Sequence, residues 1–224
     1  MSELVLAIDA GSPISSAALA SHGRLLAEAA AESRSGTRLL ALVGECFRAA
    51  ERAAGELTAV VAVAGPGSFT GVRITLATAL GLAPGIAGEG PSSLPLRTIS
   101  TLAALALHAP PESDRLLAAV DALRGELFVQ PFVRDGGTWK PEREPSRIAG
   151  DALATLGGPP APLYSHRELR FAWPHGIRCV SQLAARVACA ASDARTADSP
   201  LFSGRVRPIY LRDAATTPPR SHSR

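Results

Sequence analysis

The residues best placed to do chemistry form a short run of glycines and hydroxyl side chains between two apolar stretches. The run reads Ala64-Gly65-Pro66-Gly67-Ser68-Phe69-Thr70-Gly71-Val72-Arg73-Ile74. Backbone amides at such a strand-to-helix junction can hold an anion or let a neighbouring segment approach closely. The run lacks the Gly-Lys-Ser/Thr ending of a Walker loop and the Gly-x-Gly-x-x-Gly spacing of dinucleotide folds. A tight turn capped by Ser68 or Thr70 also explains it without a ligand, and both interpretations stay open.

A second candidate is the turn Asp9-Ala10-Gly11-Ser12, which lies between two apolar runs. A carboxylate and backbone amides in a hairpin turn can face a metal-bound nucleotide. Ordinary hairpin chemistry is the alternative, with Asp9 accepting hydrogen bonds from the amides of its own turn. A phosphate site made by Asp9, Gly11 and Ser12 is therefore a hypothesis that the turn alone does not decide.

The histidines and cysteines do not form a recognisable metal site. No His-x-x-x-His or His-Glu-x-x-His spacing occurs, so two ligands one helical turn apart are missing. The three cysteines form no Cys-x-x-Cys pair, and no Ser, His and Asp arrangement is recognisable. We expect no metal, no cofactor and no catalytic residue. A metallopeptidase remains a rival that metal analysis of the protein would test. The residues concerned are His22, His108, His166, His175, His222, Cys46, Cys179 and Cys189.

Composition narrows the class of protein. The 224 residues are 46% hydrophobic, which is enough for one large core or two small ones. No stretch reaches the roughly 18 to 20 apolar residues of a membrane helix, and the first residues lack the basic segment of a secretory signal, so we expect a cytoplasmic protein without membrane contact. A net charge of +3 without a basic cluster, and 4% aromatic residues, argue against a stand-alone RNA-binding module.

The elements that position these residues follow from the hydrophobic pattern. Three short apolar runs separated by turns predict a three-stranded meander, and a β-branched run before the glycines predicts a buried strand. Apolar residues at helical spacing predict two helices, the first stopped by Gly55 and the second by Pro84-Gly85. A third helix has Ser100 or Thr101 as its N-cap. The strands are Leu4–Ile8, Ser15–Ala20, Leu25–Ala29 and Thr58–Ala64, and the helices are Thr37–Ala54, Thr70–Ala83 and Ile99–His108.

This order fits one half of an actin-like, ribonuclease-H-like α/β fold. A doubly wound dinucleotide fold ranks lower, because its first strand should be followed by a helix, whereas Asp9 leads into a hairpin. After Pro110-Pro111 the pattern starts again with two strands and a turn. We predict two lobes, 1–109 and 110–212, followed by a disordered tail over 213–224. The second lobe is expected to contain strands at Leu116–Val120 and Glu126–Val133 and helices near Ile148–Leu156 and Ser181–Ser192.

The glycine-rich run also carries a family resemblance. Gly65 to Ile74 resembles the signature of TsaB proteins at every position. The resemblance covers nearly the whole chain, but it is thin from Gly136 to Arg207. Leu123 stands where the family usually has arginine. Further similar segments are Leu6–Asp9, Arg38–Leu40, Gly81–Ala83, Ser100–Leu102, Asp121–Glu126 and Tyr210–Arg212.

The resemblance implies a non-catalytic scaffold subunit of the bacterial complex that places a threonylcarbamoyl group on tRNA adenosine. Such a subunit binds a TsaD-type transferase as a heterodimer, a TsaE-type ATPase joins them, and tRNA is reached through the complex. A homodimer is possible when the subunit is alone. The family is regarded as having lost a working ATP site, which would make Asp9, Gly11 and Ser12 a vestigial phosphate loop. The rival is an actin-like small-molecule kinase that uses ATP, with Asp121 as its nearest catalytic carboxylate.

The two helices of the first half are the predicted docking surface. On the first helix, apolar residues form two neighbouring stripes, which is a wider surface than one sheet contact needs. The second helix has small residues on one side. Burial within the domain is the alternative, but the resemblance implies a four-helix contact with the transferase. The docking residues are then Leu40, Val43, Gly44, Phe47, Ile74, Thr78 and Gly81.

The glycine-rich run has a supporting role in this interpretation. Gly65, Pro66, Gly67, Ser68, Phe69, Thr70 and Gly71 set the start and position of the second helix. We expect Arg73, just inside that helix, to pair with a carboxylate on this chain or on its partner.

Overall fold

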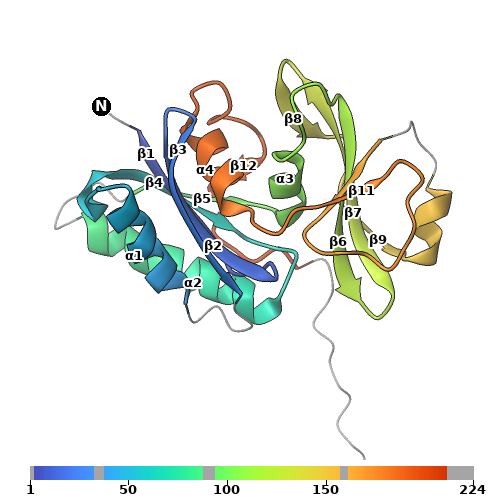
Figure 1. The fold of residues 1–224 in the computed structure, drawn as a ribbon, viewed down its shortest axis with the longest axis horizontal. Helices are drawn as coiled ribbons and strands as arrows, with labels where there is room; N and C mark the ends of the chain where they lie inside the picture. The colour runs from blue at the N-terminus through green and yellow to red at the C-terminus, as the bar shows by residue number, and fades with distance from the viewer. Residues whose placement is uncertain (1–2, 33–37, 88–93, 157–160, 211–224) are drawn as a thin grey trace, which may run out of the picture.

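The chain is described here from a computed structural model that covers residues 3–32, 38–87, 94–156 and 161–210. Two β-sheets stand side by side with helices between them and on the outer face of the first (Figure 1). The first sheet has the strand order β12-β5-β4-β1-β2-β3. The second has the order β11-β10-β6-β7-β8, with β9 paired to β7.

The strands of the first sheet are β1 (Leu4–Asp9), β2 (Ile14–Ser21), β3 (Arg24–Glu32), β4 (Leu57–Val63), β5 (Leu96–Ile99) and β12 (Phe202–Ser203). Those of the second sheet are β6 (Arg115–Leu123), β7 (Glu126–Asp135), β8 (Thr138–Pro141), β9 (Ser146–Ala149), β10 (Leu163–Ser165) and β11 (Ile177–Cys179). The helices are α1 (Leu39–Ala49), α2 (Phe69–Ala87), α3 (Thr101–Ala106) and α4 (Ala184–Ser192), with 3₁₀ turns η1 (Ala54–Glu56) and η2 (Asp151–Thr155).

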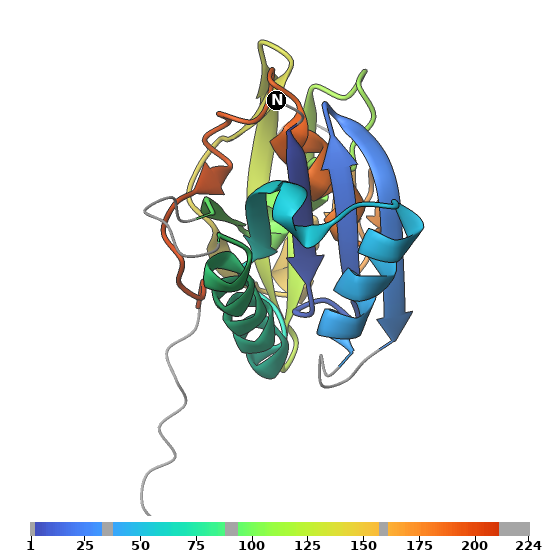
Figure 2. The ribbon, with the colours of Figure 1, turned by 90° about the vertical axis from the view of Figure 1, so that its left-hand side faces the viewer.

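The first sheet begins with the predicted meander. Strands β1, β2 and β3 are antiparallel neighbours, and β4 and β5 extend the sheet parallel to β1. Helices α1 and α2 cover one face of this sheet (Figure 2). Because side chains alternate along a strand, Leu6 and Ile8 of β1 face these helices, whereas Val5 and Ala7 face the other side. Both faces are buried at β1, β2 and β4, so these strands contain few charged residues, whereas the edge strand β3 is largely exposed.

Two predicted helix ends are wrong. Helix α1 ends at Ala49, and Glu51 takes a left-handed conformation at φ 52°, so the chain has turned before Gly55, which lies in η1. Helix α2 continues past Pro84 to Ala87. A proline near the end of a helix removes one backbone hydrogen bond but keeps a helical φ, which explains why the helix does not end at Pro84. The predicted cap of α3 is confirmed, because the Ser100 hydroxyl accepts from the Ala103 amide.

The second sheet also begins with an antiparallel pair, β6 and β7, joined by the predicted turn. The helix expected near Ile148–Leu156 is absent from the structure. Its place is taken by the end of β9 and the 3₁₀ turn η2, because Gly150 interrupts the run and donates its amide to the Gly125 carbonyl at 2.7 Å. Among the described residues, no helix has the length and apolar character needed to span a bilayer.

The two sheets exchange their covering helices. Helix α3 comes from the first half of the chain but packs on the second sheet through Leu102 and Leu105, and α4 comes from the second half but packs on the first sheet. The expectation that the Ser181–Ser192 helix belongs to the second lobe is therefore wrong. One apolar core runs from Val5 through both helices to Phe132. The division at residue 109 remains a proposal about chain segments, and the predicted disordered tail lies outside the described residues.

Candidate functional site

The glycine-rich run leaves the end of β4 and is held by backbone hydrogen bonds on several sides. The Gly65 carbonyl accepts from the Thr101 amide at 2.8 Å, and the Ile209 amide donates to the Ala64 carbonyl at 2.8 Å. Gly65 has φ 93°, a conformation that side chains rarely adopt. The Ser68 hydroxyl accepts from the Gly71 amide at 3.3 Å, which confirms Ser68 as the cap of α2.

The run packs directly on the β1–β2 turn. The Ser68 amide donates to the Gly11 carbonyl at 2.9 Å. A Cβ at Gly67 would lie 2.6 Å from that same carbonyl oxygen, and a Cβ at Gly71 would overlap the carbonyl oxygen of Ala10. These two glycines are therefore required for close approach of backbone to backbone. No anion is needed to explain their presence.

The amides of the β1–β2 turn are already used within the chain. The Ala10 amide donates to the Thr75 hydroxyl at 2.8 Å, and the Gly11 amide donates to Asp9 Oδ1 at 2.8 Å. The Ser12 amide is 3.4 Å from the same oxygen. Thr75 itself donates to the Gly71 carbonyl at 3.0 Å, so α2 and the turn are tied together. A phosphate at Asp9, Gly11 and Ser12 would have to break these bonds first.

Asp9 is fully buried beneath this packing. Burial raises the pKa of its carboxyl to about 6, and hydrogen bonds from Ser12 and Gly11 lower that pKa only in part. Asp9 Oδ2 and the Ser12 hydroxyl oxygen have no partner that satisfies hydrogen-bond geometry, although the hydroxyl is close enough to favour the charged form slightly. The carboxyl is thus held by its own turn and is shielded from solvent.

A cleft of about 700 Å³ lies between the start of α2 and the second sheet. Asp121 lines it at the β6–β7 turn and forms an ion pair with Arg167 at 3.5 Å. His166 also lines it, and its pKa is lowered to about 4, first by burial and then by the nearby Arg167 charge, so the ring is neutral at pH 7. Asp9 does not line this cleft. Asp121 therefore faces the cleft while the buried Asp9 carboxyl does not, so the two carboxylates that the rival kinase would use do not share this cleft.

Aromatic residues form one wall of the cleft. The Phe69 and Tyr210 rings stack with centroids 5.4 Å apart, and the Arg73 guanidinium lies 3.8 Å above the Phe69 ring. Arg73 Nε donates to the Tyr210 hydroxyl at 3.3 Å. Within the described residues Arg73 thus contacts aromatic rings where the sequence suggested a carboxylate. Pairing with a carboxylate on a partner stays a prediction.

The predicted docking residues divide into an exposed group and a buried group. Leu40 is 61% exposed on α1, and Gly44 and Gly81 are exposed, with open space where a Cβ would point. Phe47, Ile74 and Thr78 are half-buried. The assignment of Val43 to the docking surface is wrong, because it is only 3% exposed and packs in the core between α1 and the first sheet.

Sequence reasoning missed Leu80, which is 52% exposed on α2. The stripe that does enter the core contains Val72, Leu76 and Ala79. Leu80 lies off that stripe, but α2 is apolar on nearly every side, so its sequence gives no polar face against which Leu80 would stand out. Among the described residues, no group of three or more His, Cys, Asp or Glu side chains is arranged to hold a metal ion.

Comparison with known proteins gives two kinds of match. Residues 28–191 match the family model described as TsaD, tRNA N6-adenosine threonylcarbamoyltransferase. The chain is 35% identical over 142 residues to the tRNA threonylcarbamoyladenosine biosynthesis protein TsaB of Escherichia coli, which covers 62% of this chain and 59% of that protein. It is 33% identical over 103 residues to the TsaB of Haemophilus influenzae, covering 44% and 40%. The chain thus matches about half the length of these relatives.

Solved structures are similar over a longer range. YeaZ from Pseudomonas aeruginosa superposes with a TM-score of 0.73 at 25% identity, covering 93% of this chain and all of that one. A second structure, of an uncharacterized protein with similarity to peptidase YEAZ from the same organism, gives a TM-score of 0.73 at 23% identity over 94% of this chain. Together with the family model, these matches confirm the predicted two-lobed actin-like α/β fold.

Proposed function

The chain belongs to the TsaB family, and we propose that it is a non-catalytic scaffold subunit in tRNA threonylcarbamoyladenosine biosynthesis. In this proposal it binds a TsaD-type threonylcarbamoyltransferase through the outer faces of α1 and α2. The relatives are named as proteins of that pathway, which supports the pathway for this chain. The chemistry itself belongs to the partner.

One observation carries the docking proposal. The outer faces of α1 and α2 lie next to each other over the first sheet (Figure 2), and each exposes a large apolar side chain, Leu40 at 61% and Leu80 at 52%. The small residues Gly44 and Gly81 leave open space beside them. Exposed apolar side chains next to open space allow a second pair of helices to pack closely, with its own side chains filling that space. A contact of standard size would bury on the order of 1,600 Å² in total.

A supporting role without catalysis agrees with the state of the β1–β2 turn. Its amides are consumed by Asp9 and Thr75, and α2 starts directly on it. The turn therefore supports the start of α2 and fixes the position of that helix. We include the TsaE-type ATPase and tRNA in the proposal as later components, reached through the transferase, and a homodimer as a state of the isolated subunit.

The test is Gly44→Arg, measured by calorimetric titration with the TsaD-type subunit. Gly44 faces open space inside α1, so the isolated variant should fold with an equal or higher melting temperature, because arginine is a better helix former than glycine. A long charged side chain at this position should obstruct a facing helix. We expect binding to weaken by at least about 2 kcal/mol. Gly55→Arg is the matched control, because Gly55 is also exposed with open space around it but lies in η1. Normal binding by the Gly44 variant would overturn this docking surface.

Phe47→Ala and Leu40→Ala separate docking from folding. Phe47 is half-buried against the chain's own core, so its truncation should lower both the melting temperature and the affinity, the affinity by roughly 2 to 4 kcal/mol if the ring is a hot spot. Leu40 is mostly exposed and should affect affinity alone. If Leu40→Ala binds normally and Phe47→Ala only unfolds, the partner sits elsewhere. Adding the TsaE-type ATPase and tRNA to the pair in gel filtration tests the larger assembly.

A further inference from the structure

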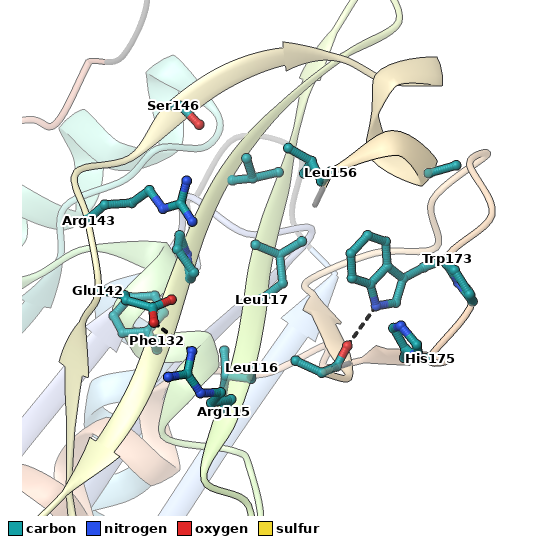
Figure 3. A pocket seen from close by; sticks show the side chains of 15 residues that line it. Arg115, Leu116, Leu117, Phe132, Glu142, Arg143, Ser146, Leu156, Trp173 and His175 are labelled. Carbon is teal, nitrogen blue, oxygen red and sulfur yellow. Dashed lines mark hydrogen bonds and ion pairs between the residues drawn. The ribbon is translucent and has the colours of Figure 1, made fainter. Parts of the chain in front are cut away.

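The second lobe carries a cavity that the proposed function does not use. It lies on the face of the second sheet opposite α3, and its lining residues, some of which Figure 3 labels, are not shared with the cleft at Asp121 or the α1–α2 surface. Its volume is about 190 Å³. A cavity of about 150 Å³ is known to hold benzene, so this one has room for a single ring with a short substituent. Residues 157–160, which connect two of its lining residues, are outside the described part.

The floor of the cavity is apolar and rigid. Leu117 of β6 pairs with Pro131 of β7, and Val129 lies two residues along the same face. On the same face, these floor residues belong to the outer core of the second sheet, which includes Leu153 and Leu163. A floor made from two paired strands keeps its shape without a ligand, which lowers the entropic cost of binding one.

One wall is an aromatic side chain with a fixed orientation. The Trp173 indole Nε1 donates to the Ala161 carbonyl at 2.8 Å, and the ring meets His175 edge-to-face, with centroids 5.8 Å apart (Figure 3). Trp173 is half-buried, so part of the indole remains open toward the cavity. A planar apolar ligand would find a large contact surface there.

The opposite side is polar and carries an unused positive charge. Arg115 is neutralised by Glu142 at 2.6 Å, but within the described residues the Arg143 guanidinium has no carboxylate within ion-pair distance. Figure 3 shows Arg143 reaching toward the floor from the side opposite Trp173, with Ser146 nearby. The Arg143 backbone is held in place, because Gln130 Nε2 donates to its carbonyl at 3.0 Å.

We propose that this cavity binds a small carboxylic acid with one ring or a short branched apolar body, its carboxylate on Arg143 and its body between Leu117 and Trp173. An apolar floor excludes ligands that are charged throughout, and its size excludes a nucleotide. The free guanidinium favours a monoanion, since a carboxylate matches its planar fork of donors. Ser146 supplies a second donor on the same side.

The experiment titrates the full chain with phenylacetate and follows Trp173 fluorescence, with Trp139, buried on β8, as a constant background. Two control ligands are compared with it: phenylacetamide, which lacks the negative charge, and acetate, which lacks the apolar ring. We expect saturable binding of phenylacetate, and binding at least about tenfold weaker for each of the other two. No saturable response to phenylacetate, or equal affinity for the amide, would overturn the proposal.

Two pairs of variants locate the binding. Arg143→Gln should remove the preference for the acid over the amide, whereas Arg147→Gln, a nearby exposed arginine that does not line the cavity, should keep it. Ala154→Phe should fill the cavity from an exposed position and abolish binding, and Thr155→Phe next to it should not. Unchanged binding in both Arg143→Gln and Ala154→Phe would show that phenylacetate binds elsewhere, and the site would be rejected.

Discussion

The first turn of each sheet has the same local design but the opposite surroundings. At β1–β2, Asp9 Oδ1 accepts from the amide two residues later at 2.8 Å, and at β6–β7, Asp121 Oδ1 does the same at 2.7 Å. Asp9 is completely buried with its second oxygen unpartnered, whereas Asp121 is half-exposed and its second oxygen meets Arg167. The glycine-rich run closes over the first turn, whereas none of the described segments covers the second turn in the same way. The same local motif thus supports the start of α2 in the first sheet and lines an open cleft in the second.

The difference between the two turns predicts that a substitution at Gly71 causes the largest loss of stability. Gly71→Ala should destabilise the chain by at least about 3 kcal/mol, because the added Cβ would overlap the Ala10 carbonyl oxygen and neither backbone segment has room to move. At the second turn, Gly125→Ala should cost only about 1 kcal/mol, since Gly125 lies at φ 80° but an added Cβ meets open space. Urea denaturation of both variants measures the difference. Equal costs would mean that the first turn is not packed as described.

A second effect concerns the charge on Asp9. Its raised pKa means that the folded chain holds the proton more tightly than the unfolded chain, so Asp9 favours folding below about pH 4, and that contribution is lost as the pH rises through about 6. Asp9→Asn removes the stability loss that comes from charging the buried carboxyl. The side-chain amide oxygen of the variant can still accept a hydrogen bond from the Gly11 amide. We therefore expect the variant to be more stable than the parent at pH 7, by up to about 3 kcal/mol, with the gap closing at pH 4. Denaturation at both pH values is the measurement.

Asp121→Asn is the control for that experiment. Its carboxylate is half-exposed and loses only the ion pair with Arg167, so stability at pH 7 should fall by less than about 1 kcal/mol. A destabilised Asp9→Asn variant at pH 7 would contradict the comparison, because it would mean that the buried carboxylate gains more from its surroundings than burial costs it.

The smallest effect is expected at Leu123, where the second turn carries an exposed leucine at φ 64°. Asparagine tolerates this left-handed conformation better than leucine does, and the leucine side chain buries little in the folded chain. Leu123→Asn should therefore stabilise the protein by roughly 0.5 to 1 kcal/mol, and Leu123→Ala should change little, as measured by thermal melts. A loss of stability in both variants would show that Leu123 packs against the cleft.

The difference between the two turns also shows what the sequence could predict. The meander, β4, the cap at Ser68 and the family signature are encoded locally, by alternation, turn residues and spacing, and they were predicted. That the glycines at 67 and 71 meet the Ala10 and Gly11 carbonyls is a contact between segments about 60 residues apart, which no local pattern contains. For the same reason Val43 was assigned to the surface. A helix that is apolar on two sides does not reveal which side its own sheet covers.

The exchange of helices between the sheets has a consequence for synthesis on the ribosome. The first sheet begins at Leu4, yet α4 and β12, which cover and extend it, are made after its other five strands. While the chain emerges, the apolar inner face around Val5 and Ala18 therefore stays uncovered until Val187 and its neighbours have been synthesised. A nascent first half leaves this second face of its sheet uncovered, and we expect it to bind chaperones until α4 has been synthesised. A gene truncated after residue 109 should accordingly give aggregates in place of a small folded lobe.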